Sequence, residues 1–142
     1  MAITQAICTS FKGEVLQGIH NFSSGGGDTF KIALYVSAAT LGASTTVYSA
    51  TNEVSGTGYT AGGVTLVNVG VSTSGTTAFL SFNNATWTSA SFTTRGALIY
   101  NSTDSNKAVC VLDFGSDKTI SSGDFTVQMP TNDAVNAILR LS

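Results

Sequence analysis

The chain has 142 residues, of which 14 are charged, while Ser, Thr and Gly together account for 54. Soluble domains usually carry about a quarter charged residues, so the outer surface is expected to be largely neutral. The length fits one domain, residues 1–142, and 42% hydrophobic residues are enough to form one core. The net charge of -2 and six singly placed basic residues exclude the clustered Lys and Arg that nucleic-acid binding requires.

The N-terminal residues lack the basic start and continuous apolar run of a secretion signal. No stretch reaches the ~20 apolar residues of a membrane span. We therefore expect synthesis in the cytoplasm and no membrane partner. In that reducing compartment Cys8 and Cys110 are expected to be buried thiols, although a disulfide between them stays open.

Residues 1–22 form an N-terminal arm with the one helical pattern in the chain. Apolar residues recur there at spacings of four, four and three: Phe11, Val15, Ile19 and Phe22. Ser10 is placed to cap the start of this helix. After the glycines at 25–27 the period changes to two, which predicts a strand from Phe30 to Val36.

Residues 37–63 contain few large aliphatic side chains and many small residues. We predict a long ordered loop, with one helical turn around Thr45 to Asn52. Loops of this length in compact domains are usually functional. The alternative is a surface loop that has no function of its own and tolerates sequence changes.

From Val64 onward, short alternating segments are separated by turn residues about every ten positions, which is typical of a sandwich or barrel. The predicted strands are 64–71, 76–82, 86–93, 96–100, 107–114, 124–129 and 137–141. Residues 107–114 include apolar side chains at both the odd-numbered and the even-numbered positions, which predicts a central strand covered on both faces. Residues 115–123 are expected to form a loop. Val67, Val69 and Val71 are expected to share one face of a strand, and Leu139 and Leu141 are expected to face inward.

The whole pattern predicts an all-β protein with about eight strands and a short N-terminal helix. The expected architecture is an antiparallel β-sandwich of Ig-like or jelly-roll type.

Catalytic and metal-binding patterns are not found. The single histidine, His20, is expected to be a capping or surface residue, and it has no paired nucleophile pattern around it. Two cysteines and one histidine do not provide a closed zinc site. Asp113, Asp117 and Asp124 lie around one predicted loop and would suit calcium, although turn capping is the favoured interpretation. We therefore expect no enzyme activity and no cofactor.

Two aromatic residues fall at strand positions that alternate with the positions predicted to face the core. Trp87 and Phe79 fall on the faces opposite Phe92 and Leu80, so they are expected to point outward. Exposed aromatic side chains on a surface with few charges suit a protein partner or, for Trp87, a stacked sugar ring. Burial of both beneath a loop is the alternative.

Two segments resemble small virion proteins of tailed bacteriophages. The first begins TFKIALYVSAATLGASTTVY at Thr29 and continues through NEVSGTGYTAGG to Gly63. The second comprises RGALIYN from Arg95, AVCVLDF from Ala108 and GDFTVQMP ending at Pro130. The resemblance covers more than half of the chain and is to proteins associated with the phage head. It implies a capsid decoration, or cement, protein without enzyme activity.

The hypothesis from sequence is therefore a non-enzymatic protein on the outer surface of the capsid that stabilises contacts between capsomers. The expected partners are the major capsid protein and further copies of the chain, as a dimer or trimer. Residues expected at the protein interface are Tyr48, Glu53, Tyr59, Phe79 and Trp87. The alternatives are a structural role in the tail, neck or baseplate, and a carbohydrate-binding module built on Trp87.

Overall fold

The computed structural model describes residues 2–142 and is mostly β-structure. A five-stranded sheet has the order β1-β7-β6-β2-β3, and a three-stranded sheet has the order β4-β5-β8. All paired strands in both sheets are antiparallel. The elements are β1 (Ala6–Ile7), α1 (Thr9–Leu16), β2 (Phe30–Tyr35), β3 (Val64–Thr65), β4 (Ser72–Ser74), β5 (Thr77–Leu80), β6 (Ala85–Asn101), β7 (Lys107–Val127) and β8 (Leu139–Leu141).

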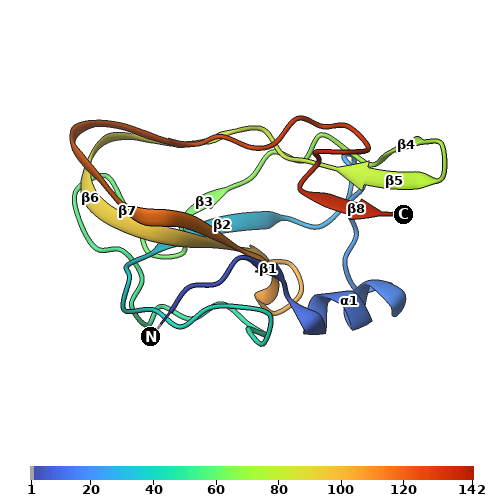
Figure 1. Cartoon of the computed structure of the whole chain (residues 1–142), viewed down its shortest axis with the longest axis horizontal. Coiled ribbons are helices and arrows are strands. Elements are labelled where there is room, and N and C mark those ends of the chain that lie inside the picture. Colours follow the sequence, from blue (N-terminus) through green and yellow to red (C-terminus); the bar gives the residue numbers. More distant parts are fainter. Residues whose placement is uncertain (1) are drawn as a thin grey trace.

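The two longest strands, β6 and β7, form a ribbon that dominates the fold. They pair from Asn101 opposite Lys107 to Ala85 opposite Val127, with four register shifts along the way. Figure 1 shows this ribbon bending sharply at one end of the molecule and returning above the central sheet. β-bulges bend a strand and increase its twist, so the register shifts explain how one strand crosses both layers.

The predicted break of this ribbon into separate strands is wrong. Residues 86–93 and 96–100 belong to one strand, and residues 115–123 continue β7 instead of forming a loop. Small residues in left-handed conformation, such as Gly115 with φ of 83° and Ser122 with φ of 51°, interrupt the regular pleat without ending the pairing. Turn-like residues at bulges therefore looked like a loop in the sequence.

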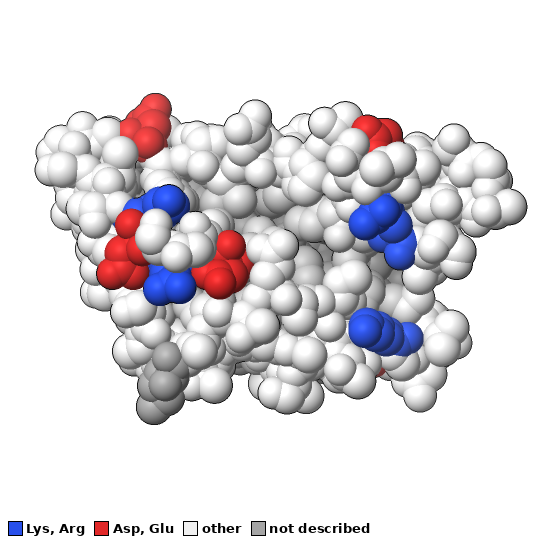
Figure 2. Space-filling model, viewed as in Figure 1, with Lys and Arg blue, Asp and Glu red and all other residues white. Residues whose placement is uncertain are grey.

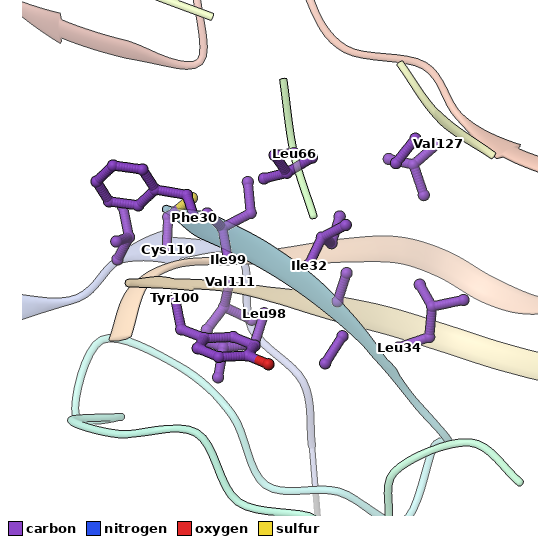
Figure 3. Packing of buried hydrophobic residues seen from close by; sticks show 14 of the residues in the cluster. Phe30, Ile32, Leu34, Leu66, Leu98, Ile99, Tyr100, Cys110, Val111 and Val127 are labelled. Carbon is purple, nitrogen blue, oxygen red and sulfur yellow. The ribbon is translucent and has the colours of Figure 1, made fainter. Parts of the chain in front are cut away.

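The core lies on both faces of β2, β6 and β7. The fully buried side chains include Ile32, Leu34, Leu98, Ile99, Val109 and Val111. Figure 3 shows Phe30, Ile32 and Leu66 on one side of the sheet, with Leu98 and Tyr100 on the opposite side, facing the segment that follows β2. The prediction that the strand after Lys107 is central and covered on both faces is confirmed over Ala108 to Val111.

The N-terminal helix is confirmed, but it is shorter than the apolar spacing suggests. α1 buries Phe11 and stops at the Gln17 cap, followed by Gly18 with φ of 74°. Glycine readily takes the left-handed conformation that ends a helix. The expected cap at Ser10 is wrong, because the N-cap residue is Cys8 and no side chain caps the helix.

Both cysteines are buried free thiols, as expected. Burial raises the pKa of Cys8 to about 11, with a smaller contribution from the charge of Glu14. Burial likewise raises the pKa of Cys110 to about 12. Both side chains are therefore neutral packing residues near pH 7. Among residues 2–142, no helix is long and apolar enough to span a bilayer.

Candidate functional site

The long segment between β2 and β3 is ordered around one carboxylate, that of Glu53. Tyr48 donates its hydroxyl to Glu53 Oε1 at 2.6 Å, and Tyr59 donates its hydroxyl to Oε2 at 2.5 Å. The amide of Gly62 donates to the same Oε2 at 2.7 Å. One half-buried side chain thus joins three points of the segment, and hydrogen bonds to a charged acceptor are among the stronger ones in proteins.

The same network fixes the segment to the central sheet. Tyr59 Oη accepts the amide of Leu34 in β2 at 2.9 Å, and Tyr100 in β6 donates its hydroxyl to the Gly62 carbonyl at 2.6 Å. The rings of Tyr48 and Tyr100 stack with centroids 4.7 Å apart. Burial is the main cause that raises the pKa of Tyr48 and Tyr59, and the hydrogen bonds to Glu53 raise it further. These hydroxyls are therefore protonated donors across the ordinary pH range.

Residues 37–63 contain no named helix or strand, so the predicted ordered loop is confirmed. The helical turn expected around Thr45 to Asn52 is wrong: the chain there makes only a turn at Thr51 and Asn52, with φ of 60° at Asn52. Close docking requires glycine at position 63. Its φ is 79°, and a Cβ there would overlap the carbonyl of Ile32.

Three of the five residues predicted at an interface, Tyr48, Glu53 and Tyr59, are brought together by the structure, but they bond to one another. Their hydrogen-bonding groups are used inside the protein, and the role at an interface stays a prediction. The structure gives them a direct task, which is to hold the loop on the sheet.

The expected outward orientation of Trp87 and Phe79 is wrong. Trp87 is 3% exposed and packs near Tyr59 and Phe125, with ring centroids 6.2 and 6.0 Å away. Phe79 is 8% exposed. The register shift between Trp87 and Ala90 reverses the alternation of β6, so Trp87 lies on the same face as Phe92, and Tyr59 and Phe125 contact both rings. Trp87 therefore presents no stacking face to solvent. In β5 the neighbouring residues Phe79 and Leu80 are both buried, so both faces of that strand are covered.

His20 is also placed differently from expectation, because its side chain is fully buried. Its Nε2 lies 2.9 Å from Glu14 Oε1, and its Nδ1 lies 3.0 Å from Nδ2 of Asn101. Asn101 Nδ2 also donates to Asp28 Oδ2 at 2.8 Å. This chain of polar contacts connects α1, the glycine turn and the end of β6, so its evident role is to hold the N-terminal arm.

Two of the three aspartates considered for calcium, Asp113 and Asp124, make local contacts. Asp113 Oδ1 accepts the Gly115 amide at 2.9 Å and lies 3.3 Å from Arg95 Nε. Asp124 accepts the amide of Ser89 at 3.3 Å. Within residues 2–142, no group of three or more His, Cys, Asp or Glu side chains is placed to hold a metal ion.

An apolar groove lies between α1 and the three-stranded sheet. Its volume is about 430 Å³. One wall and the floor come from the N-terminal arm, through Ile7, Phe11, Val15, Leu16 and Phe22. The other wall comes from Val71, Ala78, Phe79, Leu80, Leu139 and Leu141.

Large apolar side chains at the edge of this groove face solvent. Leu16 is 89% exposed, Leu141 is 67% exposed and Val71 is 55% exposed. Isolated apolar residues are normal on a protein surface, but a contiguous apolar patch marks an interaction site. The groove is therefore the candidate functional site, and Phe79 is the one predicted interface residue that lines it.

Two basic side chains, Lys12 of α1 and Arg140 of β8, complete the lining. Figure 2 shows basic groups over α1 and over β8, with uncharged surface between them. Neither side chain has an acidic partner within 4 Å among the described residues, whose ion pairs are His20 with Glu14 and Arg95 with Asp113.

The groove was not predicted from the sequence, because residues of its wall such as Leu80 and Leu139 were expected to face the core. Val67, Val69 and Val71 were expected to share one face, and that face is exposed. The alternate positions face inward instead: Leu66 is buried, and Asn68 Nδ2 donates to the carbonyl of Phe22 at 2.7 Å. Leu141 was likewise expected inward. The sequence did contain a sign of this arrangement, because apolar residues occur at both odd-numbered and even-numbered positions between 64 and 71.

No family model matches the chain, and no curated protein and no solved structure matches it.

Proposed function

We propose that this protein is a non-enzymatic component of a phage particle that binds the outer surface of the capsid and stabilises contacts between capsomers. The observation that carries the proposal is the solvent-facing apolar groove on a protein with few surface charges. Binding through this groove would bury Leu16, Val71 and Leu141 with little cost of desolvating charge. The resemblance of residues 29–63, 95–101, 108–114 and 123–130 to head-associated phage proteins supports the same role.

The ordered body of the protein suits this role. The Glu53 network holds the long loop against the central sheet, so little backbone entropy is lost on binding. We propose a β-sandwich architecture in which the bent β6–β7 ribbon and the three-stranded sheet cover one face of the five-stranded sheet. We also propose that copies of the protein associate into a dimer or trimer on the capsid.

The alternative sites in the particle are the tail, the neck and the baseplate, which would use the same kind of surface. A carbohydrate-binding function is less favoured, because the ring of Trp87 is buried and the apolar groove lacks an exposed tryptophan.

Co-sedimentation with phage heads that lack the protein tests the proposal. The wild-type chain should bind heads saturably, at a fixed ratio to the major capsid protein. Absence of binding to heads, together with labelling of the tail in cryo-electron tomograms, would reject the capsid role.

Matched variants show whether the groove is used. Val71→Asp places a charge at the groove edge, whereas Val135→Asp places one at a valine that is 72% exposed and does not line the groove. The proposal predicts that Val71→Asp weakens binding to heads by about a hundredfold, as for loss of a central contact. Val135→Asp should bind like the wild type.

A further inference from the structure

One side of the groove is an open sheet edge. β8 is the last strand of its sheet and pairs only with β5, from Leu139 opposite Leu80 to Leu141 opposite Ala78. Figure 1 shows β8 on the side of β5 that faces α1. An edge strand presents backbone N–H and C=O groups that can pair with another extended chain. The groove therefore offers backbone hydrogen bonds as well as apolar surface.

The cations in the groove lining restrict the charge of an occupant. Lys12 lies on α1 and Arg140 lies on β8, so a bound segment would pass between them. Arg140 helps to lower the pKa of Asp133, after the hydrogen bonds from Asn136 and Val135, but the two side chains form no ion pair within 4 Å. A carboxylate on the occupant would supply the missing counter-charge.

The same cations make a second copy of this chain a poor occupant. A two-fold axis through the groove would place the same surface on both partners, which would bring Lys12 and Arg140 of each copy to one interface. Like charges at an interface are unfavourable. A fatty acid would satisfy the cations and the apolar lining, but it would leave the edge of β8 unpaired.

We propose that the groove binds an extended segment of a partner protein, which adds as a strand to the open edge of β8. The segment has apolar side chains at alternate positions, which enter the groove, and an Asp or Glu that pairs with Lys12 and Arg140. Strand addition of this kind obtains affinity from main-chain hydrogen bonds and specificity from alternate side chains. This inference rests on the proposed function in one respect: on the capsid, a capsid subunit would supply the segment.

Selection of displayed random peptides of about ten residues against the immobilised full chain tests this inference without any phage component. The wild-type protein should enrich peptides with alternating apolar residues and one acidic residue. The double variant Lys12→Glu, Arg140→Glu should enrich Lys or Arg at the acidic position. Lys118→Glu, which reverses an exposed cation outside the groove, should enrich the same peptides as the wild type.

Hydrogen exchange then tests the binding mode. An enriched peptide should slow exchange of β8 amides by about tenfold or more, as expected for new backbone hydrogen bonds, and it should bind the charge-reversed variant about tenfold more weakly. The inference is overturned if enriched peptides lack an acidic residue, if charge reversal leaves the selection unchanged, or if bound peptides leave β8 exchange unaltered. Selective binding of dodecanoate without peptide enrichment would overturn it in favour of a lipid. Failure of head binding with success of this selection would reject only the capsid role.

Discussion

The two ends of the molecule use their polar and apolar groups in opposite ways. At the loop end, the carboxylate of Glu53 accepts three hydrogen bonds, and the tyrosines around it pack into the protein. At the groove end, Leu16, Val71 and Leu141 face solvent, Lys12 and Arg140 lack ion-pair partners within the described residues, and β8 is an open edge.

This difference separates residues that maintain the fold from residues that are available to a partner. A contact that is already satisfied within the chain contributes to stability, and its loss should unfold the loop. An apolar or charged group that is not satisfied within the chain contributes little to stability, and its loss should affect binding. The following predictions test that separation, from the largest expected effect on stability to the smallest.

Glu53→Ala should cause the largest loss, about 3 kcal/mol of unfolding free energy, because two tyrosine hydroxyls and one backbone amide lose a charged acceptor. Urea unfolding followed by tyrosine fluorescence measures the change. Glu53→Gln keeps one acceptor oxygen and should cost about 1 kcal/mol. Equal, near-zero effects for both variants would show that the loop does not depend on this carboxylate.

Leu139→Ala should cost about 2 kcal/mol, because this leucine is 6% exposed and its truncation leaves a cavity beneath β8. Thermal unfolding by calorimetry provides the measurement. A stability equal to that of the wild type would mean that β8 is not packed as the structure describes.

Asp28→Asn should reduce the loss of stability in acid. Burial alone would raise the pKa of Asp28, but hydrogen bonds from the Asn21 amide and the Asn101 side chain hold it below its usual 3.8. A carboxyl group with a lowered pKa in the folded state stabilises the protein above its unfolded pKa, and this contribution disappears as the pH falls through the folded value.

Urea midpoints measured from about pH 6 to pH 2 should therefore fall more steeply for the wild type than for Asp28→Asn. Parallel pH profiles for the two proteins would contradict the assignment. Thr103→Ser, which keeps the neighbouring hydroxyl bond to Thr29, is a suitable control and should retain the wild-type profile.

Leu141→Ser should change the unfolding free energy by less than about 0.5 kcal/mol, because this leucine is 67% exposed. The contrast with Leu139→Ala, two residues earlier in the same strand, is the sharpest stability test of the groove wall. A loss as large as that of Leu139→Ala would show that Leu141 belongs to the core of the free protein, as its alternation in the sequence suggested.

The sequence predicted the β-rich class, the N-terminal helix, the long ordered loop and the central position of Val109 and Val111, because these depend on local periodicity and composition. It did not predict the bend in the β6–β7 ribbon, because serines and glycines at bulges resemble those of loops. The register shift between Trp87 and Ala90 places Trp87 on the buried face with Phe92, and such a shift could not be read from alternation alone.

The candidate site was less accessible to sequence analysis. Tyr48, Glu53 and Tyr59 were predicted at a protein interface, but their mutual hydrogen bonds depend on how the loop folds back onto β2 and β6. The groove lies between α1 and a sheet whose strands begin more than fifty residues later in the sequence. Among its lining residues, only Phe79 was predicted at a protein interface.

Hydrogen exchange of the protein free and bound to phage heads tests the central claim most directly, because it examines both ends in one measurement. We predict slower exchange on binding in α1 and β8, with residues 37–63 protected equally in the free and bound states. New protection confined to residues 37–63, with α1 and β8 unchanged, would contradict the assignment of the groove as the docking surface.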